Sequence, residues 1–101
     1  MNIGQKELIT STESQMILSP NIYYRNTSTN LTSLSITFNT NGVNDTILNE
    51  YFVEFTTSSS GTTLSFPSSV KWENGEVPEF ESSSTYQVSI VNNLGVVVKF
   101  K

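Results

Sequence analysis

The side chains that could carry chemistry gather in one acidic segment. Glu73, Glu76, Glu79 and Glu81 lie within nine residues. Carboxylate clusters of this kind bind calcium, and a pair of carboxyl groups can act as acid and base. Calcium loops favour Asp and Asn at alternate positions, however, and the chain has only one Asp. We therefore expect a solvated hairpin and loop, with no catalytic and no metal-binding residue.

Composition excludes most other catalytic centres. His and Cys are both absent, so the chain has no imidazole base, thiolate nucleophile, zinc ligand set of the usual kind or disulfide. Without a base to activate a hydroxyl group, the serine runs at 58–60 and 82–84 are interpreted as loops. We expect a protein that is not an enzyme and holds no cofactor.

Charge and hydropathy exclude two classes of partner. The formal net charge is −4 and the pI is about 4.5, which argues against a phosphate-binding surface and hence against nucleic acid. No apolar run approaches the roughly 18 residues that a membrane span needs. The first ten residues lack a basic segment followed by an apolar one, so we expect synthesis in a cytoplasm.

The residues that remain favour β-strands. Ser, Thr and Asn make up 40 of the 101 residues and Ala is absent, so helix-forming residues are scarce. Apolar and polar side chains alternate in four segments, which are Leu31–Phe38, Ile47–Thr57, Thr85–Asn92 and Gly95–Lys101. This period of two predicts an all-β fold, an antiparallel β-sandwich or a jelly-roll-like barrel of about eight short strands.

The first fifteen residues differ in character from the rest. We interpret Met1–Gln15 as an N-terminal docking arm and residues 16–101 as the β-sandwich domain. The arm is too short to bury a core, so we expect it to be disordered until it adds to a partner's sheet or surface. Its apolar side chains Ile3, Leu8 and Ile9 are the candidate docking residues.

Four aromatic residues could form a platform for a sugar ring. Trp72 and Tyr86 fall on the inward sets of their strands, so we expect both in the core. Tyr23 and Tyr24 are adjacent, and neighbouring residues of a strand face opposite ways. One of these two tyrosines should therefore point outward and be available for contact with a sugar or a neighbouring subunit.

Four segments together resemble a small β domain of virion proteins of tailed bacteriophages. They read SPNIYYR at 19–25, LNEYFVEFTT at 48–57, TLSFPSSVKWENGEVP at 63–78 and TYQVSIVNNL at 85–94. The domain occurs in head-fibre and tail-fibre-associated proteins, including those of crAss-like phages. The resemblance covers roughly residues 16–101 and brings no catalytic motif with it.

The resemblance implies a structural role in the virion. The expected protein is a head-fibre or capsid decoration component, made in the bacterial host cytoplasm, with capsid or other fibre proteins as partners. Fibre proteins of this kind are commonly threefold, so a homotrimer is favoured over a dimer. The alternative function is that of a glycan-binding module, displayed on the virion for adhesion to the host or to mucus.

Overall fold

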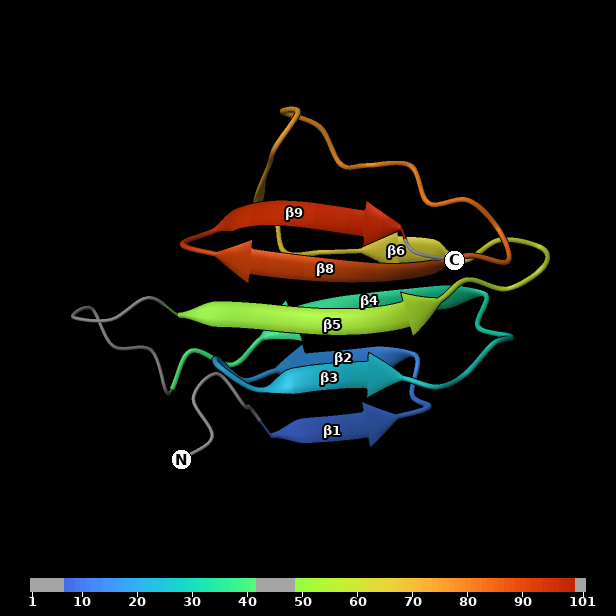
Figure 1. The fold of residues 1–101 in the computed structure, drawn as a ribbon, viewed down its shortest axis with the longest axis horizontal. Helices are drawn as coiled ribbons and strands as arrows, with labels where there is room; N and C mark the ends of the chain where they lie inside the picture. The colour runs from blue at the N-terminus through green and yellow to red at the C-terminus, as the bar shows by residue number, and fades with distance from the viewer. Residues whose placement is uncertain (1–6, 42–48, 100–101) are drawn as a thin grey trace.

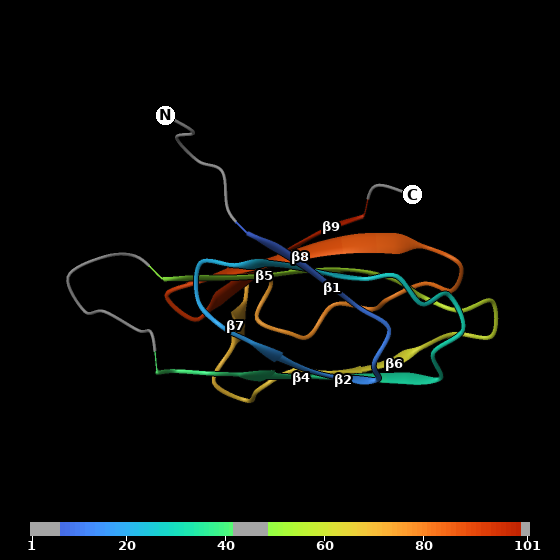
Figure 2. The ribbon, with the colours of Figure 1, turned by 90° about the horizontal axis from the view of Figure 1, so that it is seen from below.

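The computed structural model describes residues 7–41 and 49–99, and they form two β-sheets (Figure 1). The large sheet has the strand order β1-β3-β5-β8-β9-β7 and the small sheet the order β2-β4-β6. Figure 2 shows the two sheets stacked face to face, as in a sandwich. The strands are β1 (Leu8–Ser11), β2 (Gln15–Leu18), β3 (Tyr23–Asn26), β4 (Ser33–Phe38), β5 (Glu50–Thr56), β6 (Thr63–Ser65), β7 (Lys71–Trp72), β8 (Thr85–Val91) and β9 (Leu94–Lys99).

The chain path explains why many of the strand pairs are parallel. From β1 to β6 each strand lies in the opposite sheet from the one before it, so strands that neighbour each other within a sheet run the same way. The pairs β1–β3, β3–β5, β2–β4 and β4–β6 are parallel, whereas β5–β8 and β8–β9 are antiparallel. The predicted all-β sandwich is confirmed, but the antiparallel arrangement applies only to β5, β8 and β9.

The core lies between the two sheets, and the apolar sets of Leu31–Phe38, Ile47–Thr57 and Thr85–Asn92 point into it. The fourth alternating segment, Gly95–Lys101, has the opposite phase: Val96 and Val98, which its alternation placed inward, are exposed, and Gly95 is buried against Trp72. In the part of the chain that the structure describes, the fully buried apolar side chains of the core are Leu18, Leu34, Ile36, Val53, Phe55, Val88 and Ile90. Trp72 is 8% exposed and Tyr86 is 4% exposed, so the prediction that both belong to the core is confirmed. Trp72 meets the ring of Phe66 edge to face, with ring centroids 5.1 Å apart.

The small sheet covers only part of the large one, and residues 73–84 cover much of the remainder. This loop connects β7 to β8 and runs along the top of the molecule in Figure 1. Its residue Phe80 packs edge to face against Tyr86, at 5.0 Å between ring centroids, and against Phe55 at 5.5 Å. Because Phe55 and Tyr86 are inward residues of β5 and β8, Phe80 closes the core where the small sheet ends.

Part of the segment that we expected to be a docking arm belongs to the folded domain, because the first strand already begins at Leu8. Leu8–Ser11 pairs in parallel with β3, and the amide of Tyr23 donates to the carbonyl of Glu7 at 2.9 Å. The expectation that the arm is disordered until it meets a partner is therefore wrong for these four residues. Their pairing strand begins 15 residues further along the chain, so no local pattern reveals it. Ile3 lies outside the described residues.

Candidate functional site

Two hollows in the surface have lining residues that could bind a ligand. The larger has a volume of about 520 Å³ and lies beneath the loop 73–84. The smaller has a volume of about 320 Å³ and lies on the outer face of the large sheet, across β1, β3, β5 and β8. Their linings differ in charge, and that difference decides which of them is the better candidate.

The larger hollow contains the acidic cluster. Its lining includes Glu73, Glu76, Glu79 and Glu81 around the partly apolar surface of Trp72 and Tyr86. All four of these glutamates are exposed. Within residues 7–41 and 49–99, no three Asp or Glu side chains lie close enough together to share a metal ion. The cluster therefore offers neither a ligand set for a cation nor an enclosed pair of carboxyl groups.

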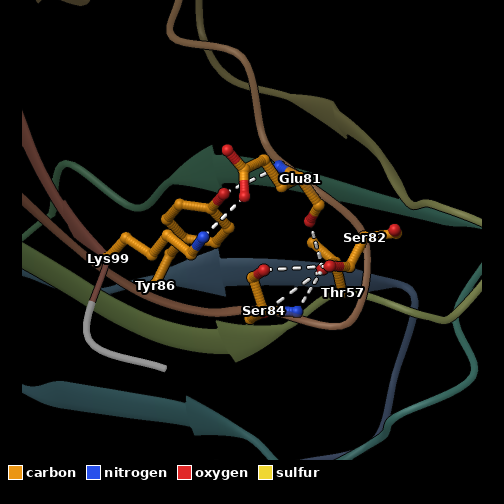
Figure 3. A network of polar contacts seen from close by, with 6 residues as sticks. All are labelled: Thr57, Glu81, Ser82, Ser84, Tyr86 and Lys99. Atoms are coloured by element: carbon orange, nitrogen blue, oxygen red, sulfur yellow. Dashed lines mark hydrogen bonds and ion pairs between the residues drawn. The ribbon is translucent and has the colours of Figure 1, made fainter.

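The end of this loop is fixed by a network of polar contacts (Figure 3). The buried Thr57 hydroxyl donates to the carbonyl of Glu81 at 2.5 Å and accepts from the amide of Ser84 at 2.9 Å. The amide of Glu81 donates to the hydroxyl of Tyr86 at 2.7 Å. These bonds hold the loop against β5 and β8, so they account for the position of Phe80 in the core.

Glu81 also forms an ion pair with Lys99 on β9, at 2.5 Å between Oε2 and Nζ. The hydrogen bond from Lys99, together with its positive charge, lowers the pKa of Glu81. The same hydrogen bond raises the pKa of Lys99. Both groups are solvent-exposed, so the pair contributes little to stability and its main effect is to direct the side chain of Glu81 toward β9.

The smaller hollow lies between an apolar row and a polar row of side chains. In the apolar row, the register pairs Leu8 with Tyr23 and Tyr23 with Phe52. The rings of Tyr23 and Phe52 are stacked, with centroids 4.2 Å apart and planes inclined by 24°. Because outward positions repeat every second residue, the next outward row lies two residues further along each strand.

The polar row consists of Arg25, Glu54 and Gln87, which the register places side by side on β3, β5 and β8. The Nε of Arg25 donates to Oε2 of Glu54 at 2.7 Å. The side-chain amide of Gln87 donates to Oε1 of the same carboxylate at 3.0 Å. Glu54 is thus held by two neighbours, and the three connected polar side chains all line the hollow.

The structure brings three of the five predicted site residues to this hollow. Leu8, Tyr23 and Tyr24 line it, although the Tyr24 side chain is buried and its hydroxyl accepts from the amide of Ser19 at 3.0 Å. Tyr23 is therefore the outward tyrosine of the pair. Ile9 faces the opposite way and packs against the core. That these residues contact a partner stays a prediction.

Four lining residues were not predicted as site residues: Arg25, Phe52, Glu54 and Gln87. Alternation along residues 47–57 already placed Phe52 and Glu54 on the outward set of their strand. It could not identify the strand that lies beside them. The site forms because the parallel pairs β1–β3 and β3–β5 and the antiparallel pair β5–β8 align outward residues from distant parts of the sequence.

Comparisons of the chain with family models, with curated proteins and with solved structures found no match. In the part of the chain that the structure describes, no helix is long and apolar enough to cross a membrane. The proposals for function therefore depend on the residues, their arrangement and the resemblance of the four sequence segments.

Proposed function

We propose that this chain is a structural protein of a bacteriophage virion, a head-fibre or capsid decoration component without enzymatic activity. The resemblance of the four segments supports the class of assembly. The linings of the two hollows are more typical of binding than of catalysis, because neither includes a serine, threonine, cysteine or histidine. Capsid or other fibre proteins are its proposed partners.

The observation that carries the proposal is the uncharged outer face of the small sheet. The register aligns Gln15 with Ser35, Ile17 with Thr37 and Ser33 with Thr63 across three strands. All the outward side chains of β2, β4 and β6 are uncharged: Gln15, Ile17, Ser33, Ser35, Thr37, Thr63 and Ser65. A second chain can cover this face without removing a charge from water, which would oppose association.

The edge of this sheet at β2 also suits assembly. Edge strands present unpaired backbone groups, and proteins that stay monomeric commonly block them with charges, proline or bulges. The strand Gln15–Leu18 has no charged residue and no proline, and its Ile17 is 65% exposed. We propose that the chain forms a homo-oligomer in the virion, a trimer before a dimer.

The test is quantitative mass spectrometry of purified phage particles. We expect the wild-type chain at a fixed copy number relative to the major capsid protein. Thr37→Lys places a charge in the middle of the uncharged face and should lower incorporation at least about tenfold. Ser59→Lys, in an exposed loop on another part of the surface, is the matched control and should incorporate normally. Absence of the wild-type chain from particles, or normal incorporation of Thr37→Lys, would contradict the proposal.

A second function, that of a glycan-binding module displayed on the virion, is supported by the smaller hollow. Its apolar row and its polar row lie side by side on the outer face of the large sheet and line a hollow of about 320 Å³. Particles that lack the chain should then adsorb to host cells or mucus more weakly than complete particles. Unchanged adsorption would leave the structural role as the only function proposed.

A further inference from the structure

We propose that the hollow lined by Leu8, Tyr23, Arg25, Phe52, Glu54 and Gln87 is a binding site for a neutral saccharide. This inference rests on the glycan-binding function, and it specifies the location of the site and the chemical class of ligand. The volume of about 320 Å³ is at the lower end of the range for small-ligand sites, roughly 300–1,000 Å³. Such a space suits one or two sugar rings rather than a long chain.

The apolar row provides the surface for the C–H groups of a sugar. Tyr23 and Phe52 support each other by stacking, so the two rings form one rigid wall at the side of the hollow. Leu8, which is 48% exposed, extends this wall on the side of β1. Rigid aromatic groups lose little conformational entropy when they bind, so their contact area is used efficiently.

The polar row provides donors and acceptors for the hydroxyl groups. A guanidinium carries five N–H groups in a fixed fork. The Nε of Arg25 donates to Glu54, and the Arg25 side chain lines the hollow and is 47% exposed, so we expect its other N–H groups to be available to a ligand. Gln87 donates its amide hydrogen to Glu54 and keeps its carbonyl oxygen as an acceptor. Donors next to an acceptor suit adjacent hydroxyl groups of a sugar, which can both donate and accept.

The charge balance favours a neutral ligand over an anionic one. Glu54 compensates the positive charge of Arg25 at 2.7 Å, so the site has no excess positive charge for a phosphate or sulfate group. The chain as a whole has a net charge of −4, which further disfavours anions. We therefore expect neutral hexoses and N-acetylhexosamines to bind better than sialic or uronic acids.

The experiment is a titration of the isolated, ¹⁵N-labelled full-length protein followed by NMR. The probes are glucose, galactose, mannose, N-acetylglucosamine and their β-linked disaccharides, each up to about 20 mM, where weak sites of this size begin to fill. Backbone shifts should concentrate at residues 8–10, 23–25, 52–54 and 87. Arg25→Lys keeps the charge but loses the guanidinium fork, and should weaken binding about tenfold. Phe52→Leu keeps an apolar side chain but loses the ring wall, and should weaken it to a similar degree.

Lys71→Arg is the matched control, because Lys71 is an exposed basic residue of the same sheet, outside the hollow. It should bind like the wild type. The inference is overturned if no probe shifts any resonance, if the shifts lie at another surface, or if Arg25→Lys and Phe52→Leu bind normally. Because the isolated protein is used, failure here is distinguishable from failure of the virion proposal, which is decided by the composition of particles.

Discussion

The side chain of Trp72 determines which residue can stand opposite it on the neighbouring strand. Its ring lies over Gly95 on β9, the strand that pairs with its own short strand β7. A Cβ added at Gly95 would lie 2.7 Å from two ring carbons of Trp72, closer than such contacts occur. The glycine at this position is therefore required by close approach of an aromatic ring. Alternation along the sequence identified Trp72 as a core residue, but only its strand pairing shows why position 95 has no side chain.

Trp72→Ala should lower the free energy of unfolding by about 3–5 kcal/mol, the usual range for a large buried aromatic residue. The cavity would open next to Val70, which is buried, and Phe66, which is partly buried against the core, and we expect neither side chain to fill it completely. Urea unfolding followed by far-UV circular dichroism measures the change without relying on the lost fluorophore. Val77→Ala, at a position 58% exposed, should cost less than about 0.5 kcal/mol. A tryptophan variant as stable as this control would show that the ring contributes no packing.

At the scale of elements, the alternation of residues predicted where strands lie but not how they pair. Residues 33–38, 50–56 and 85–91 alternate clearly and each forms a strand. Parallel pairing between β1 and β3, or β2 and β4, depends on the path of the chain across the core, which has no local signature. The candidate site depends on how the strands pair. The sequence therefore indicated that one of Tyr23 and Tyr24 faces outward, without deciding which, and it did not reveal the polar row of Arg25, Glu54 and Gln87.

Thr57 joins the loop 73–84 to the sheet, so we expect Thr57→Val to destabilise the protein by about 1–3 kcal/mol. The substitution keeps the shape of the side chain but leaves the carbonyl of Glu81 and the amide of Ser84 without this partner. Thermal unfolding measured by calorimetry gives the magnitude. Thr63→Val, on the exposed side of β6, is the control and should be nearly neutral. Equal effects at the two positions would contradict the role of the network.

The ion pair between Glu81 and Lys99 makes a prediction for pH. Because the pKa of Glu81 is lowered in the folded state, the contribution of the pair to stability is complete above the pKa of the unfolded chain. It is lost as the pH falls through the lowered value. An NMR titration of the Glu81 carboxyl group should give a midpoint below its ordinary value, and Lys99→Met should raise that midpoint. Added salt should have the same direction of effect, because the pair is exposed. A midpoint unmoved by Lys99→Met would show that the pair does not form in solution.

At the scale of the whole molecule, the two sheets differ in size and in the character of their outer faces. The large sheet has an ion pair, an aromatic stack and exposed apolar side chains on its surface, whereas the small sheet is uniformly uncharged. These differences underlie the two proposals, which place a small ligand on the outer face of the large sheet and a second protein on that of the small sheet. The composition already indicated an uncharged surface in this part of the chain, since residues 14–44, which include β2 and β4, contain one charged residue.

Oligomeric state tests this view of the molecule as a whole. Light scattering at about 100 µM, well above the Kd of a stable assembly, should give the mass of a trimer, or failing that of a dimer.

Because Leu8–Ser11 is part of the large sheet, the docking arm must be tested by removing residues 1–6 alone. A shorter chain that folds and still enters particles at normal copy number would contradict the docking role. A monomeric full-length protein would contradict the oligomer.

The alternation of β1 to β6 between the two sheets has a consequence for the time that folding takes. Between two strands that pair in parallel, the chain passes through one strand of the opposite sheet. The backbone hydrogen bonds of β1 can therefore form only after β3 is in place, and those between β3 and β5 only after β5 is in place. The β8–β9 hairpin is closed by a short turn and can form early, because its ends are close in the chain. We expect refolding to take milliseconds to seconds, as in other domains with few local pairings. In stopped-flow refolding with pulsed hydrogen exchange, amides of β8 and β9 should become protected before those of β1 and β2. Simultaneous protection throughout would mean that the sandwich closes in one step.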